Sequence, residues 1–229
     1  MKTLQQIAHI GCLLFIAATA LNAQVLAVTE NGDTIYVYPN GTWSYDELDE
    51  MPIMEESGLF ELDENLVIDT ISTHFKYASS SDKEVENANN QFVIKYNSDK
   101  WRRVPPASLN DDAEFAFEHK ERDIWCVVIA EEIPIEMEAL FSIAKNNMAN
   151  FTGTGVEVLK AEVRRVNGSE VLRGVMRTES SGIPFLFDTY YFSNDKCSVQ
   201  FTVWTSVNIW ENQLEDIEEL HNGFIATKE

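Results

Sequence analysis

The sequence predicts an α+β domain in which a mainly antiparallel sheet is flanked by helices. Three observations lead to this class. Asn-Gly steps separate runs of β-prone residues, which is typical of tight hairpins. Apolar residues recur at helical spacing in segments 136–151 and 208–224. Between these two segments lie further β-prone runs that are separated by turn residues.

Residues 1–23 are predicted to be a signal peptide. Lys2 gives a short positive region, residues 7–21 are mainly apolar, and Ala23 stands where signal peptidase would cut. This apolar run is shorter than the roughly 20 residues that a membrane-spanning helix needs. We therefore expect export to the periplasm or the extracellular space. Lipid attachment at Cys12 is the less favoured alternative.

The charge of the chain argues against a nucleic-acid partner. The sequence has 38 acidic and 17 basic residues, a net charge of −21, and Lys2 would leave with the leader. Binding a phosphate backbone requires cations that displace its counterions. A chain this acidic repels nucleic acid and anionic lipid.

Residues 24–46 are predicted to form a three-stranded β meander. Runs at 25–29, 34–38 and 42–45 are β-prone, and Asn31-Gly32 and Asn40-Gly41 separate them. The tract resembles a short hairpin segment that recurs near the start of exported bacterial proteins. This resemblance implies no particular activity.

Residues 47–90 are predicted to be an acidic linker. From Asp46 to Asp69 every charged residue is acidic, and like charges at this density oppose compaction. Calcium binding is the alternative, because hard cations prefer carboxylate oxygens. The spacing has no EF-hand pattern, so an extended linker is favoured.

Residues 91–229 are predicted to be the main domain. It begins with a strand at 92–96 and a loop carrying Trp101, followed by strands at 113–119 and 124–132 and a helix at 136–151 that ends before Gly153. A turn at Asn167-Gly168 then predicts the pairs Arg165 with Glu170, Val163 with Leu172, Leu159 with Met176 and Glu162 with Arg173.

A second hairpin is predicted to turn at Asn194-Asp195. This turn pairs Phe192 with Cys197, Tyr190 with Val199 and Leu186 with Val203. The opposite face carries the aromatic residues Phe185, Phe187, Tyr191 and Trp204. We expect the helix that begins near Asn208 to cover them, because aromatic stripes usually belong to the core. The alternative is a ligand pocket between sheet and helix.

The segment from Phe92 to Trp101 and the ending Leu220-His221-Asn222-Gly223-Phe224 resemble the PsbP-like superfamily. The element order β β β α β β β β α is also similar to that family. Asn97 stands where the family usually has proline. The resemblance implies an α/β/α sandwich from Gln91 to the C-terminus, and it implies a non-catalytic protein that binds other proteins.

Two cysteines remain after the leader, Cys126 and Cys197. Both lie in apolar, strand-like runs. An even pair in an oxidising compartment can form a disulfide if the two strands lie within bonding distance. Two buried thiols are the other alternative, since free cysteine behaves as a small hydrophobe.

A small basic cluster surrounds Trp101. Trp101, Arg102 and Arg103 are a candidate partner surface, and together with Lys100 the two arginines can bind an anionic ligand. They can equally rest against the acidic linker, which we favour because much negative charge lies nearby in the chain.

The sequence shows no pattern of a catalytic, cofactor or metal site. His74, His119 and His221 are far apart and lack metal-ligand or triad spacing, so each is expected on the surface or in a turn. We expect a non-enzymatic protein-binding or assembly module of the cell envelope, whose partner is another envelope protein. The alternative is a small-ligand-binding protein or hydrolase.

Overall fold

The computed structural model describes residues 25–28, 34–37, 43–44 and 67–227 of the chain. The chain divides into two units, 1–56 and 57–229. In the first unit, strands β1 (Val25–Val28), β2 (Thr34–Val37) and β3 (Trp43–Ser44) pair antiparallel in that order. The expected signal peptide, both Asn-Gly turns and residues 45–66 of the acidic stretch lie outside the described residues. The signal peptide and the complete meander therefore stay predictions.

The second unit is built on an eight-stranded sheet with the order β4-β10-β11-β12-β13-β9-β8-β7. All neighbouring strands are antiparallel except β4 and β10, which are parallel. The predicted antiparallel-rich sheet is thus confirmed. The strands are β4 (Asp69–Phe75), β7 (Trp101–Val104), β8 (Phe115–His119), β9 (Ile124–Glu131), β10 (Glu157–Val166), β11 (Ser169–Ser180), β12 (Ile183–Ser193) and β13 (Ser198–Ser206).

A smaller sheet has the order β14-β6-β5, formed by Phe224–Ala226, Phe92–Tyr96 and Lys83–Glu86. Its apolar side chains join the core of the large sheet. The ring of Phe224 lies 5.2 Å from that of Phe192 on β12, and the ring of Tyr96 lies 5.1 Å from that of Phe117 on β8. Each distance joins ring centroids.

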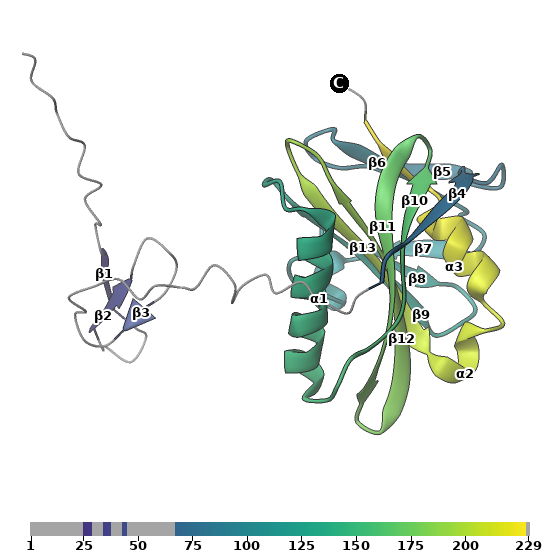
Figure 1. Ribbon diagram of the computed structural model, residues 1–229. Coiled ribbons are helices and arrows are strands. Elements are labelled where there is room, and N and C mark those ends of the chain that lie inside the picture. The colour runs from purple at the N-terminus through teal and green to yellow at the C-terminus, as the bar shows by residue number, and fades with distance from the viewer. Residues whose placement is uncertain (1–24, 29–33, 38–42, 45–66, 228–229) are drawn as a thin grey trace, which may run out of the picture. The chain divides into compact units, whose positions relative to one another are not determined.

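Helices cover the large sheet on both faces (Figure 1). Helix α1 (Met137–Thr152) packs on Leu172, Met176 and Tyr191, while α2 (Val207–Trp210) and α3 (Leu214–His221) pack on the face that carries Tyr190. Successive side chains of a strand point to opposite faces, so Tyr190 and Tyr191 identify the two layers. A short 3₁₀ helix, η1, spans Pro106–Ser108. No helix among the described residues is long and apolar enough to cross a bilayer.

The helices differ in detail from the expectation. Helix α1 ends where predicted, because Gly153 adopts a left-handed φ of 66° and its N–H bonds back to Ala149 O. The expected helix over 208–224 is instead two short helices followed by strand β14. These helices also cover the opposite face from Phe185, Phe187, Tyr191 and Trp204, so the expected cover was wrong. Of those four residues, Tyr191 contacts α1 through Phe141.

The folded sheet starts earlier than expected. Strands β4 and β5 lie within residues 47–90, which the sequence predicted to be a linker. The charged and polar residues of β4 are mostly exposed, since this strand forms one edge of the large sheet. An edge strand has few apolar positions, and its sequence therefore carries little strand signal.

Both predicted hairpins are present in the structure. The predicted register is right at most positions of the first hairpin and is shifted in the second. In the first, Arg165–Glu170, Val163–Leu172 and Glu162–Arg173 are confirmed, but Met176 faces Val158 because of an irregularity after that residue. The second hairpin is displaced by two residues, so that Phe192 pairs with Val199, Tyr190 with Phe201 and Leu186 with Thr205.

The displaced register has a cause in the turn. Asn194 N–H donates to Cys197 O at 3.0 Å, and Asn194 Oδ1 accepts from the N–H groups of Lys196 and Cys197. The turn therefore spans four residues rather than two. A shift of two residues keeps every side chain on its predicted face.

Candidate functional site

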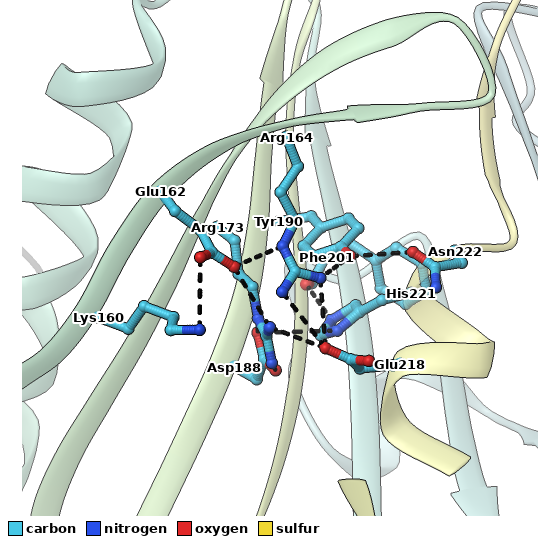
Figure 2. Close-up of polar contacts among 10 residues, drawn as sticks. All are labelled: Lys160, Glu162, Arg164, Arg173, Asp188, Tyr190, Phe201, Glu218, His221 and Asn222. Atoms are coloured by element: carbon cyan, nitrogen blue, oxygen red, sulfur yellow. Dashed lines mark hydrogen bonds and ion pairs between the residues drawn. The ribbon is translucent and has the colours of Figure 1, made fainter. Parts of the chain in front are cut away.

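A network of charged side chains lies between the large sheet and α3 (Figure 2). Its members come from four elements of the fold: Lys160, Glu162 and Arg164 from β10, Arg173 from β11, Asp188 and Tyr190 from β12, and Glu218 and His221 from α3. The strand register produces this cluster. Arg173 pairs across the sheet with Glu162 on one side and with Tyr190 on the other.

Arg173 is the centre of the network. Its Nε lies 2.9 Å from Asp188 Oδ1, and its Nη1 lies 2.9 Å from Glu218 Oε1 and 3.4 Å from Glu162 Oε1. Burial opposes ionisation of the Asp188 carboxyl, but the positive charge and the hydrogen bonds of Arg173 outweigh it, and the pKa of Asp188 is lowered. The carboxylate is therefore charged and held in place inside the protein.

Arg164 forms a second set of contacts beside Arg173. Its Nε donates to Glu162 at 2.5 Å, and its Nη1 donates to Tyr190 Oη at 3.2 Å. Its guanidinium also lies 4.5 Å from the ring centroid of Phe75 on β4. Burial would raise the pKa of Glu162, but the charge of Arg164 and its hydrogen bond lower it. The two arginines thus connect three strands with α3.

His221 closes the network from the helix side. It is completely buried, and its ring stacks on Tyr190 with a centroid distance of 4.4 Å. Nε2 lies 3.0 Å from Phe201 O, which favours the tautomer with a proton on Nε2. Burial lowers the pKa of His221 to about 4, so the ring is neutral at pH 7.

Asp188 and His221 have the residue types of a catalytic pair, but their geometry favours a structural role. His221 Nδ1 lies 3.8 Å from Asp188 Oδ1 and has no hydrogen-bond partner. Both side chains are fully buried, and Asp188 already accepts hydrogen bonds from Arg173. A general base must reach its substrate within hydrogen-bond distance. The network therefore fixes α3 on the sheet.

The predicted partner surface around Trp101 is wrong in its central residue. Trp101 is only 1% exposed, and its ring packs edge-on against His119 at 5.1 Å. Arg102 and Arg103 are exposed; Arg102 Nη2 lies 2.6 Å from Glu118, and Arg103 lies over the ring of Phe115. Trp101 belongs to the hydrophobic core, because its position on β7 points its side chain into the protein.

The sequence favoured contacts between the basic cluster and the acidic linker. The ion pairs of Lys100 are instead with α3 and not with residues 67–90 of the predicted linker. Lys100 binds Asp216 at 2.5 Å and also binds Glu219, both from α3. Burial would lower the pKa of Lys100, but hydrogen bonds with these two carboxylates raise it. His119 Nε2 lies 3.4 Å from the same Asp216. The basic cluster is thus partly used to attach α3.

The two cysteines are free and buried. Ser198, next to Cys197, pairs with Glu131, which is five residues beyond Cys126 on β9. At about 3.3 Å per residue this places the two cysteines about 15 Å or more apart, whereas a disulfide needs Cα atoms within about 7 Å. The disulfide alternative therefore does not hold, and two buried thiols are the outcome.

Three aromatic side chains form a row across the other face of the sheet. Phe187 on β12 pairs with Trp204 on β13, and Trp204 pairs with Trp125 on β9. The ring centroids of Phe187 and Trp204 lie 6.2 Å apart, and those of Trp204 and Trp125 also lie 6.2 Å apart. All three side chains are partly exposed. We call these three residues the aromatic row.

The pocket that the sequence left as an alternative would bring Tyr191 together with the aromatic row, but Tyr191 lies against α1 instead. Tyr191 packs against Phe141 of α1, and Phe187 stacks on Trp204. These rings therefore contact protein atoms on at least one side. Sequence reasoning found Phe187 and Trp204 but missed Trp125, whose strand register with β13 has no local signal.

All three histidines were predicted to lie on the surface or in a turn, and this was right for one of them. His74 is exposed on β4, whereas His119 and His221 are buried. In the described part of the chain, no group of three or more His, Cys, Asp or Glu side chains is placed to hold a metal ion. The proposed calcium ligands lie mainly in residues 45–66, outside the described residues.

No family model matches the chain, and no curated protein matches it. Solved structures that match it include cyanobacterial PsbP (CyanoP) from Synechocystis sp. PCC 6803, with 16% identity, a TM-score of 0.48, and coverage of 66% of this chain and 95% of that chain. The Saccharomyces cerevisiae Ran-binding protein Mog1p has 11% identity and a TM-score of 0.46, covering 63% and 94%. LpqN of Mycobacterium tuberculosis, involved in cell envelope biogenesis, has 10% identity and a TM-score of 0.42, covering 64% and 90%. The solved structures that this chain resembles thus include a PsbP, the family that its sequence predicted.

Proposed function

We propose that this protein is an exported, non-catalytic module of the cell envelope that binds another protein. The observation that carries the proposal is the aromatic row, in which Phe187, Trp204 and Trp125 lie side by side with partly exposed rings. Trp and other large aromatic residues are enriched at protein interfaces and contribute most of the binding energy there. The row is the surface on which we place the partner.

The arrangement around the row suits a rigid binding surface. The three residues belong to adjacent central strands, and the charged network on the other face holds α3 against the same sheet. Partly exposed Thr202 and Gln200 continue this face along β13. Apolar rings with polar neighbours on a fixed sheet are typical of a preorganised interface.

Export enters the proposal from the sequence alone. Lys2, the apolar run over 7–21 and Ala23 form the pattern of a signal peptide. A strongly acidic chain with net charge −21 fits a partner that is a protein rather than nucleic acid.

Site-specific photo-crosslinking in the source organism tests the proposal. Benzoylphenylalanine at Gln200, on the same face as Trp204, should give an ultraviolet-dependent adduct with one envelope protein. The same group at Glu121, an exposed residue of the β8–β9 turn, should give none. The absence of an adduct from Gln200, or retention of the full chain in the cytoplasm after fractionation, would contradict the proposal.

A further inference from the structure

A groove of about 690 Å³ lies at the carboxyl end of β4. Phe75, Tyr77 and Ile225 give it an apolar lining, and His74, Lys76 and Arg165 place three cationic or ionisable side chains around it. No residue that lines this groove belongs to the aromatic row. None of its lining residues is acidic, although the chain has 38 Asp and Glu residues.

One turn residue holds the walls of this groove together. Asn167 has a positive φ of 50° in the β10–β11 turn, and its N–H donates to Phe75 O at 2.9 Å. Its Oδ1 accepts from Tyr77 N–H at 3.1 Å, and its Nδ2 donates to the carbonyl oxygens of Asn222 and Phe224. These bonds join β4, the turn and the start of β14. The groove is therefore shaped before any ligand arrives.

The cationic side chains of the groove are available to a ligand. Lys76, His74 and Arg165 are all exposed. Arg165 Nη2 lies 3.0 Å from Glu170 Oε2, but both side chains are about half exposed, at 48% and 56%. Exposed ion pairs contribute only about 0–1 kcal/mol, so a carboxylate of a ligand can replace Glu170 at little cost.

The groove continues along the strand rather than forming a closed pocket. A second groove, of about 400 Å³, shares His74 and Arg165 with the first and reaches back to Thr70 near the start of β4. Its lining adds the cation Arg164 and one acidic residue, Glu170, which is the exposed ion-pair partner of Arg165. Strand β4 is the last strand of the large sheet on this side. A long, open site along an edge strand suits an extended chain better than a compact small molecule.

We propose that these two grooves bind an extended acidic peptide segment of a partner protein. Its carboxylates bind Lys76 and Arg165, and an apolar side chain between them packs on Phe75 and Ile225. Arginine recognises carboxylates through paired hydrogen bonds, which favours acidic side chains over other polar groups. Side chains, rather than backbone hydrogen bonds to the edge of β4, recognise this peptide. The register of β4 against β10 shifts between Val163 and Arg165, which leaves the edge of the strand irregular. This inference rests on the proposed function and adds a second contact surface to it.

Fluorescence anisotropy with a labelled synthetic peptide of alternating glutamate and valine tests the inference. The full chain should bind this peptide, and a matched peptide of alternating glutamine and valine should bind at least about tenfold more weakly. The double substitution Lys76→Glu, Arg165→Glu should weaken binding of the acidic peptide by more than about tenfold. The matched control, Lys120→Glu with Arg122→Glu, makes the same charge change at the exposed β8–β9 turn and should leave binding within about twofold.

Equal loss in both double variants would overturn the inference, because it would mean that only total charge matters. Equal binding of the glutamine peptide, or unchanged binding to the Lys76 and Arg165 variant, would also overturn it. The crosslink from Gln200 separates this failure from failure of the proposed function. An adduct that persists while the acidic peptide does not bind leaves the module a protein binder without this groove.

Discussion

Arg173 on β11 and Asp188 on β12 form a buried ion pair beneath α3, with Nε 2.9 Å from Oδ1. The same guanidinium also contacts Glu162 and Glu218. Three carboxylates from two strands and one helix therefore share this guanidinium, and Arg164 also binds two of them, Glu162 and Glu218. A buried charge that loses its partner is expensive, so this residue carries an unusual share of the stability.

Replacing Arg173 with Met should lower the free energy of unfolding by about 3–5 kcal/mol, because three carboxylates lose a partner. The matched control is Arg177→Met on the same strand, where the side chain is half exposed and 3.8 Å from Glu157. That change should cost within about 0.5 kcal/mol. Urea unfolding followed by tryptophan fluorescence measures both. Equal stability of the two variants would mean that the network contributes little.

Stability should fall in mild acid because of His221. Its pKa is lowered to about 4 in the folded protein from 6.5 in the unfolded chain, so the unfolded state binds more protons between these values. The stabilisation is complete above about pH 6.5 and is lost as the pH falls to about 4, by on the order of 3 kcal/mol. His221→Gln should flatten this slope, whereas His74→Gln, at an exposed position, should leave it unchanged. An unchanged slope in the His221 variant would contradict the buried neutral ring.

Gly223 should tolerate no side chain. A Cβ at this position would lie 1.8 Å from the carbonyl oxygen of Lys95 on β6, a backbone atom that cannot rotate away. Gly223→Ala should therefore cost about 3 kcal/mol by overpacking and by disturbing the bond from Lys95 N–H to Gly223 O. Gly155→Ala is the control, because a Cβ there meets nothing within 4 Å. A melting temperature of the Gly223 variant equal to that of the control would contradict the close approach of Gly223 to β6.

Both cysteines should be free but unreactive in the folded protein. Burial raises the pKa of Cys126 and of Cys197, and both are 0% exposed. A thiol reagent should label neither residue in the native chain starting at Gln24, and it should label both after unfolding without reductant. Finding no reactive thiol in the unfolded, unreduced protein would show a disulfide and would contradict the strand register.

Local sequence signals predicted part of this fold and not the rest. The Asn167-Gly168 turn predicted three correct pairs of the first hairpin, because a two-residue turn fixes the register. Asn194 looked similar but closes a four-residue turn with its side chain, and the sequence does not distinguish the two turns. The shift by two residues left the faces right, so the burial of Tyr190 and Tyr191 followed from the pattern.

The candidate sites were harder to predict because they depend on distant pairings. The Glu162–Arg173 pair was predicted from the first hairpin, but Asp188, Glu218 and His221 join it only through the packing of β12 and α3. Trp101 was expected at the surface because charged residues flank it, yet alternation along β7 turns it inward while Arg102 points out. Alternation along the second hairpin placed Phe187 and Trp204 on one face, but no local pattern adds Trp125 to them. The groove beside β4 has no local pattern that marks it.

The central claim, that the aromatic row binds a partner protein, is tested most directly by the crosslink from Gln200 in variants of Trp204. Trp204→Ala should abolish the adduct, and with the purified partner it should weaken binding by at least about 2 kcal/mol, roughly 30-fold. Leu214→Ala, at an exposed apolar residue of α3 on the other face, should leave both unchanged. An adduct of equal yield in the Trp204 and Leu214 variants, with both proteins folded by circular dichroism, would contradict the claim.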